Sequence, residues 1–88
     1  MSAEPTSPNE DPVAGLLLCI VRGIVDQPDR VELRSIDHGS ETSYEVAVAQ
    51  EDLGKVIGRQ GRVANALRQA ARAAAMPTRR RVQVEIVS

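Results

Sequence analysis

Two glycines, Gly58 and Gly61, divide an otherwise helical stretch into a short segment over Leu53–Ile57 and a longer one over Arg62–Ala75. Glycine lacks a Cβ atom, so it can end one helix and turn the chain sharply into the next. The longer segment stops at Met76-Pro77, because proline cannot continue a helix. Any fold of this chain must therefore place a tight bend between two helices.

A further helix is expected from Val13 to about Val25, opened by Asp11-Pro12 and ending before Pro28. Its apolar residues are too numerous for the single buried stripe that a helix on a sheet requires. The excess favours a second covered face, most simply against a partner subunit. These apolar residues are Val13, Leu16, Leu17, Cys19, Ile20, Val21, Ile24 and Val25.

Three segments alternate apolar and polar residues and are predicted to be strands: 31–34, 44–48 and 82–86. Asp37-His38-Gly39-Ser40 has hairpin-turn chemistry, so the first two strands are expected to pair antiparallel. The last strand follows a helical crossover and can lie parallel to the second. The order α-β-β-α-α-β predicts an α+β fold, a three-stranded sheet covered on one face by three helices.

The 88 residues predict one small domain. Residues 1–12 are expected to form a disordered acidic tail, which leaves residues 13–88 as the single folded domain. Without Phe or Trp and with one Tyr, the core has to be Val, Ile, Leu and Ala, so dimerisation is a reasonable supplement to stability. Asp52 is expected to cap the short helix. Helical spacing predicts a core stripe along the longer helix at Val63, Leu67, Ala70 and Ala74.

The net charge of −1 conceals an uneven distribution. Residues 1–52 contain three arginines and eleven acidic residues, whereas residues 53–81 contain eight cations and no acidic residue. The second half therefore has the charge of a polyanion-binding surface. A solvated basic helix face balanced by an acidic segment explains the same charges.

Other features exclude several classes of function. Cys19 lies in an apolar run, which predicts a buried, inert thiol, and His38 is the only histidine, so no metal site or catalytic relay is expected. The glycine spacing matches neither a P-loop nor G-x-G-x-x-G. The apolar run 16–21 is far shorter than the about 20 residues of a membrane span, and no secretory signal is visible. These features predict a cytoplasmic protein that is not an enzyme and has no cofactor, small-molecule substrate or membrane partner.

The sequence Val56-Ile57-Gly58-Arg59-Gln60-Gly61, placed between two helices after an apolar strand, closely resembles the KH domain. The element order is similar to the bacterial type II arrangement. With almost nothing outside the domain, the chain resembles the small single-KH RNA-binding proteins of the KhpA family over residues 13–87. The resemblance implies that the G-x-x-G loop grips the backbone of about four single-stranded nucleotides.

The expected RNA-binding segment is continuous and combines three roles. The glycines let phosphates approach the backbone amides, and the helix that begins at Arg62 favours an anion there. The cations add charge, and the Val-Ile pair offers an apolar surface to bases, beside Val63 and the middle strand (Val46, Val48). Arg79-Arg80-Arg81 either extends the phosphate track or is a solvated turn. The expected site residues are Lys55, Val56, Ile57, Gly58, Arg59, Gln60, Gly61 and Arg62.

These features favour a single-stranded RNA-binding protein that acts as an RNA chaperone or post-transcriptional regulator. The resemblance implies a homodimer, a heterodimer with a second KH protein (KhpB, also called Jag), and a link to cell shape, division and envelope homeostasis. Two alternatives remain open. One is a protein-interaction module that dimerises through its first helix, and the other is a ribosome-associated factor that uses the same loop.

Overall fold

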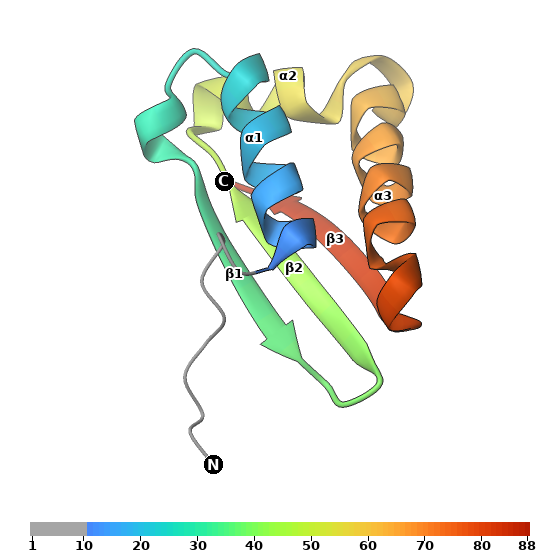
Figure 1. Ribbon diagram of the computed structural model, residues 1–88. Helices are drawn as coiled ribbons and strands as arrows, with labels where there is room; N and C mark the ends of the chain where they lie inside the picture. The colour runs from blue at the N-terminus through green and yellow to red at the C-terminus, as the bar shows by residue number, and fades with distance from the viewer. Residues whose placement is uncertain (1–10) are drawn as a thin grey trace.

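The computed structural model describes residues 11–88 (Figure 1). The expected disordered tail lies outside the described residues up to position 10, whereas Asp11 and Pro12 belong to the folded domain. The helices are α1 (Pro12–Ile24), α2 (Leu53–Ile57) and α3 (Arg62–Ala75), and the strands are β1 (Glu32–Asp37), β2 (Glu41–Ala47) and β3 (Arg81–Val87). Four 3₁₀ turns complete the described order: η1 (Pro28–Arg30), η2 (Gln50–Asp52), η3 (Arg59–Gly61) and η4 (Met76–Thr78).

The strands form one sheet in the order β1-β2-β3. β1 pairs antiparallel with β2, and β2 pairs parallel with β3, with Tyr44 opposite Val84. Figure 1 shows α1, α2 and α3 on the same face of this sheet, so the predicted α+β architecture is confirmed. Each strand is longer than its alternating segment, because backbone pairing continues into polar residues beside the turns.

One carboxylate fixes the start of α1 against the sheet. Asp11 Oδ1 accepts hydrogen bonds from the backbone amides of Val13 at 2.9 Å and Ala14 at 3.2 Å. Its Oδ2 accepts the hydroxyl proton of Tyr44 at 2.8 Å. Burial, together with this hydrogen bond to a carboxylate, raises the pKa of Tyr44 far above its usual value. The N-cap of α1 is therefore also a tie between α1 and the middle strand.

The core lies between the sheet and the helices and consists of small aliphatic side chains. Its largest fully buried apolar side chains are Leu17 and Val21 of α1, Val46 of β2, Val56 of α2 and Leu67 of α3. The predicted stripe on α3 is right at Leu67, and Val63 and Ala74 pack against the core from its edge, but the fully buried positions are displaced by one residue from the others. The buried residues are Ala64, Leu67, Ala71 and Ala75, whereas Val63, Ala70 and Ala74 are only half-buried.

The prediction of a buried thiol is wrong, because Cys19 is exposed on α1. The helix buries the side of Val13, Leu17 and Val21 against the core, and Cys19 lies on another side. Leu16 lies one turn before Cys19 and is only half-buried, whereas Ile20 is half-buried against the core. Part of the apolar excess that the sequence predicted, Leu16 and Cys19, thus lies outside the side of α1 that faces the core. None of the helices among residues 11–88 is long and apolar enough to cross a membrane.

Candidate nucleic-acid interface

The bend between α2 and α3 has an unusual backbone. Gly58 has φ +75°, Gln60 has φ 58°, and Gly61 has φ +73°, so three of four consecutive residues have positive φ. The Gly58 amide donates to the Gly54 carbonyl at 2.9 Å, and the Gly61 amide donates to the Gly58 carbonyl at 3.2 Å. Positive φ is costly for a residue with a side chain, so Gln60 stores backbone strain at the tip of the loop. Strain of this kind is concentrated at functional sites.

The two glycines of this loop serve different purposes. A Cβ atom on Gly58 would lie 2.5 Å from Val63 Cγ2 and 3.0 Å from the Val63 amide nitrogen. Gly58 is therefore required for the loop to pack against the first turn of α3. A Cβ atom on Gly61 would meet nothing within 4 Å, so only its φ favours glycine, and the space beside it is open.

The Val-Ile pair before the loop is divided between core and surface. Val56 is fully buried, so it anchors α2 to the core and offers no surface to a ligand in this conformation. Ile57 is 39% exposed and is the apolar side chain of the pair that a base can reach. Val46 and Val48 are also buried, and Val63 is half-buried against Gly58. The apolar surface beside the loop is therefore smaller than the sequence predicts.

The cations around the loop are not equivalent. Lys55 forms an ion pair with Asp26 and lies 4.0 Å from Asp52. The hydrogen bond to Asp26 raises the pKa of Lys55, so the ammonium group stays charged. Arg59 and Arg62 are exposed and have no ion-pair partner among residues 11–88. The charge of Lys55 is thus partly neutralised by Asp26, whereas no carboxylate among the described residues neutralises the charges of Arg59 and Arg62.

Asp52 does not cap α2, contrary to the prediction. It occupies the N-cap position without a side-chain capping bond. Its carboxylate instead accepts hydrogen bonds from the backbone amides of Asp26 at 3.2 Å and Gln27 at 3.1 Å. This buried carboxylate ties the segment after α1 to the start of α2 and so holds the region that leads into the loop. No local sequence signal indicates the contact, because the partners lie 25 and 26 residues apart.

The N-terminus of α3 opens at the loop. Gly61 occupies the N-cap position and provides no side-chain oxygen, so no side chain caps the helix. The first amides of a helix lack intrahelical partners and carry partial positive charge. Together with Arg59 and Arg62, they make the loop a place where negative charge is favoured.

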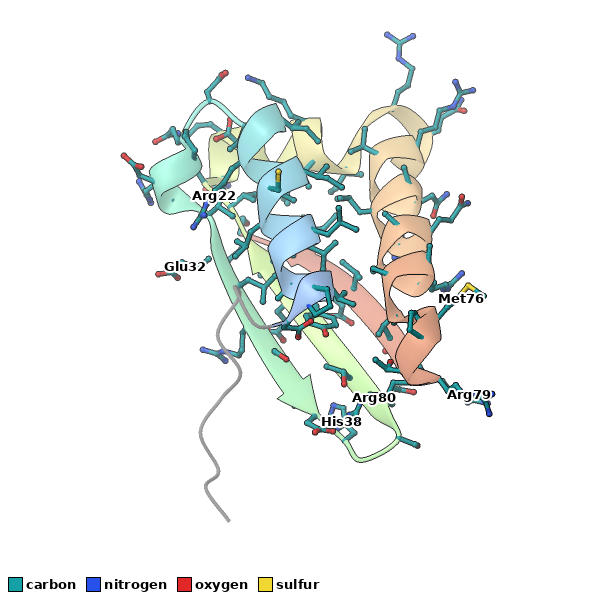
Figure 2. All side chains as sticks on the ribbon, viewed as in Figure 1. Arg22, Glu32, His38, Met76, Arg79 and Arg80 are labelled. Atoms are coloured by element: carbon teal, nitrogen blue, oxygen red, sulfur yellow. The ribbon has the colours of Figure 1, made fainter. Side chains whose placement is uncertain are left out.

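Arg79 and Arg80 lie at the opposite end of α3 from the loop (Figure 2), and Arg81, which follows them, is the first residue of β3. Arg80 is occupied, because it donates to Asp37 at 2.5 Å and to the Thr42 hydroxyl at 2.9 Å and 3.2 Å. Arg79 and Arg81 are exposed. His38 is exposed in the neighbouring turn, and residues 11–88 contain no cluster of His, Cys, Asp and Glu suited to a metal ion.

Comparison with known proteins identifies the family. A family model described as the KhpA/KhpB KH domain matches residues 15–86. The chain belongs to this family. It is 46% identical over 72 residues to a protein of Caldanaerobacter subterraneus subsp. tengcongensis named RNA-binding protein KhpA, covering 82% of this chain and 96% of that protein. RNA-binding protein KhpA of Borreliella burgdorferi is also 46% identical over 72 residues, covering 82% and 88% of the two chains.

A third relative, RNA-binding protein KhpA of Clostridium acetobutylicum, is 44% identical over 72 residues, with 82% of this chain and 96% of that protein covered. Membership of this family confirms the resemblance inferred from the G-x-x-G segment and the element order. It also confirms the prediction that the chain is not an enzyme, since the KhpA/KhpB KH family is not enzymatic.

Proposed function

We propose that this protein binds single-stranded RNA and grips its phosphate backbone with residues 55–62, centred on Gly58–Gly61. The observation that carries the proposal is the loop itself. It has three positive-φ residues, two unpaired arginines and an uncapped helix N-terminus at one point of the surface. Relatives that share up to 46% of the aligned residues are named RNA-binding proteins. Phosphates are the ligand that this combination of amides and guanidinium groups favours.

Each residue of the segment has a distinct part in this proposal. Gly58 and Gly61 give the strand access to the backbone, Arg59 and Arg62 neutralise phosphates, and Gln60 donates a neutral hydrogen bond. Ile57 contacts a base, while Val56 acts indirectly by anchoring α2 in the core. Lys55 contributes through a charge that it shares with Asp26. Without aromatic side chains beside the loop, we expect modest affinity and broad sequence tolerance.

The proposal is tested by fluorescence anisotropy with a labelled single-stranded RNA at several salt concentrations. With about three phosphates held, the plot of log K against log salt should have a slope near about −2. The double variant Arg59→Asp/Gln60→Asp reverses the charge of the loop and should abolish binding. Circular dichroism should show an unchanged fold, because both side chains are exposed.

A matched control makes the same chemical change elsewhere. Arg34 of β1 and Gln83 of β3 are exposed in the sheet away from the loop. Arg34→Asp/Gln83→Asp therefore adds the same charge and should leave RNA affinity within about threefold of the parent, because exposed charges beyond a Debye length are screened. Equal binding by the loop variant and the parent would show that the loop is not the binding site.

The side of α1 that carries Leu16 and Cys19 supports a further part of the proposal, that two copies of the chain pair through this helix. Cys19 is exposed and Leu16, one turn before it, is half-buried, while a Cβ atom on Gly23, one turn after it, would meet nothing within 4 Å. A face of this kind gains stability when a second helix covers it. A KhpB-like KH protein can take the place of the second copy, and two paired loops on one strand would raise avidity.

The single cysteine provides the test of pairing. Mild oxidation with copper phenanthroline should join two Cys19 thiols, and Leu16→Glu should abolish this crosslink and shift the protein to the monomer in gel filtration. Arg22→Glu, at an exposed position of the same helix, is the control and should retain the crosslink. A monomer at all concentrations, with crosslinking unaffected by Leu16→Glu, would overturn the α1 pairing and leave the RNA site untouched.

By family resemblance, we assign the protein a cytoplasmic role as an RNA chaperone or post-transcriptional regulator that affects cell shape and envelope homeostasis. Crosslinking in cells followed by sequencing of the bound RNA tests this role. Enrichment of messenger and small regulatory RNA supports it. Enrichment of ribosomal RNA alone would instead make the protein a ribosome-associated factor.

A further inference from the structure

The solvent side of α3 continues from the loop and contains no acidic residue. Seven residues from Arg62 to Met76 are exposed there, and Arg79 follows after the turn η4. Figure 2 shows Met76 and Arg79 on the outer side of this end of α3, directed away from the sheet. We call this set the outer face of α3. It consists of Arg62, Asn65, Ala66, Gln69, Arg72, Ala73, Met76 and Arg79.

The composition of the outer face differs from that of an ordinary solvent-facing helix. Such helices usually intersperse Glu or Asp with Lys or Arg, because pairs of opposite charge support the helix and keep the surface soluble. Here every charge is positive. Arg72 and Arg79 have no ion-pair partner among residues 11–88. Their charge is therefore available to a ligand.

Other arginines of this region form hydrogen bonds within the protein, and Arg68 is one of them. It lies on a different side of α3, is only half-exposed, and donates to the Val84 carbonyl and the Asn65 side-chain oxygen, each at 3.3 Å. It thus ties α3 to β3. Arg80 is occupied in the same way by Asp37 and Thr42. The structure uses these two arginines internally and leaves Arg72 and Arg79 exposed.

The uncharged members of the outer face also suit a nucleic-acid strand. Ala66 and Ala73 are exposed and short, so a strand can approach the helix closely between the arginines. Asn65 and Gln69 carry amides that can donate to and accept from base edges. Met76 is 73% exposed and offers a polarisable apolar surface to a base.

The spacing of the arginines fits a strand that continues from the loop. An α-helix rises about 1.5 Å per residue, so Arg72 lies roughly 15 Å along α3 from Arg62. A stacked strand advances about 3.4 Å per nucleotide, so this distance corresponds to about four nucleotides. The loop alone accounts for about four more. A strand of about eight to ten nucleotides would therefore be needed to occupy both surfaces.

We propose that the outer face of α3 is a second binding surface for the same single-stranded RNA, in which Arg72 and Arg79 hold phosphates of the segment next to that in the loop. This inference rests on the proposed function of the loop, because the loop fixes where the strand meets α3. Positive charge at Arg59, Arg62, Arg72 and Arg79, with no acidic residue between them in the sequence, selects a polyanion as the occupant.

The test compares RNA of two lengths, an oligouridylate of five nucleotides and one of twelve, with one-to-one stoichiometry checked by native mass spectrometry. The variant Arg72→Ala/Arg79→Ala should bind the 5-mer within twofold of the parent and the 12-mer about tenfold more weakly. For the 12-mer, the salt slope should become shallower by about 1.4, the value for two phosphate contacts on a single strand. Arg30→Ala/Arg34→Ala removes the same charge from η1 and β1 and is the matched control.

The outcomes separate this inference from the function of the loop. Three outcomes overturn the second surface while the loop proposal stands. Arg72→Ala/Arg79→Ala weakens binding of both RNA lengths equally, weakens binding of the 12-mer no more than the control does, or leaves binding of the 12-mer unchanged. If the parent fails to bind the 5-mer and Arg59→Asp/Gln60→Asp leaves 12-mer binding intact, the loop proposal fails. The inference that depends on it then fails as well.

Discussion

The turn between β1 and β2 and the loop between α2 and α3 share two features, a glycine with positive φ and nearby arginines, but differ in what the arginines contact. Both have a glycine with positive φ, Gly39 at +88° and Gly58 at +75°, and both have arginines nearby. In the turn, the Asp37 carboxylate accepts from the Gly39 amide at 2.8 Å and from Arg80 at 2.5 Å. The polar groups of the turn thus satisfy one another.

The arginines of the loop between α2 and α3 lack such partners among the described residues. Arg59 and Arg62 pair with no carboxylate among residues 11–88, and no side chain caps the helix that follows. Glycine and arginine are therefore insufficient to mark a binding loop in this fold. The distinguishing property is charge that the protein leaves uncompensated, and the predictions below test that distinction.

The largest effect is expected when each glycine is replaced by alanine. Gly58→Ala should cost about 2–3 kcal/mol in the free energy of unfolding, because strain at positive φ adds to the clash with Val63. RNA affinity should fall more than tenfold as the loop moves. A Cβ atom on Gly39 would meet nothing within 4 Å, so Gly39→Ala should lower the free energy of unfolding by only about 1 kcal/mol and leave RNA affinity unchanged.

Urea unfolding and RNA titration measure these two quantities. Gly54→Ala, in α2 with open space around its Cβ position, is the control and should be neutral or slightly stabilising. If Gly39→Ala weakened RNA binding as much as Gly58→Ala, the distinction between turn and loop would be wrong.

Truncation of one arginine in each region should give opposite results. Arg59→Ala should lower RNA affinity about three- to tenfold without a change in the urea midpoint, because the side chain has no ion-pair partner among residues 11–88. Arg80→Ala should leave RNA affinity unchanged and destabilise the fold by about 1 kcal/mol, because the buried Thr42 hydroxyl loses its guanidinium donors. Anisotropy titration measures the RNA affinity of both variants, and urea unfolding measures their stability. Loss of both affinity and stability in each variant would contradict the distinction between the two regions.

The sequence predicted most of the local structure, because its signals were local. The bounds of α2 and α3 agree with the structure, since Gly58, Gly61 and Pro77 are direct breaks in helical pattern. The parallel pairing of β3 with β2 was predictable because β3 follows a helical crossover. Family membership was also predictable, because it depends on a short segment and the element order.

The errors arose where a side chain's role depends on contacts between distant residues. Asp52 was expected to cap α2, but the backbone of Asp26 and Gln27 offers it two amides. In α3, alanines at nearly every turn give little contrast between faces, so the buried side was displaced by one residue from Ala70 to Ala71. Cys19 was expected inside because its neighbours are apolar, yet it lies on a side of α1 that the core does not cover.

Asp26 tests the importance of uncompensated charge at the loop between α2 and α3, because its carboxylate partly neutralises Lys55 beside that loop. The expected effect is smaller than those above. Asp26→Asn removes the carboxylate that pairs with Lys55 and should raise RNA affinity about two- to threefold, as expected for one exposed charge several ångströms away. Asp29→Asn removes one acidic charge from the neighbouring turn η1 and is the control. Higher affinity in both variants alike would indicate a general effect of net charge and remove any special role for Lys55.

The smallest effect is expected from pH at the turn. The hydrogen bond from the Gly39 amide, and then that from Arg80, hold the pKa of Asp37 below its usual value of 3.8. A carboxylate with a lowered folded-state pKa stabilises the fold above its unfolded-state pKa, and this contribution is lost as the pH falls through the folded-state value. The urea midpoint of the parent should therefore exceed that of Asp37→Asn at pH 6, and the difference should shrink as the pH falls below the usual pKa of 3.8. Asp29→Asn corrects for the general effect of lost charge. Because the proposed RNA site lies in the other loop, the affinity of Asp37→Asn for RNA at pH 7 should equal that of the parent. Weaker binding would show that the two regions are coupled and would end the contrast between them.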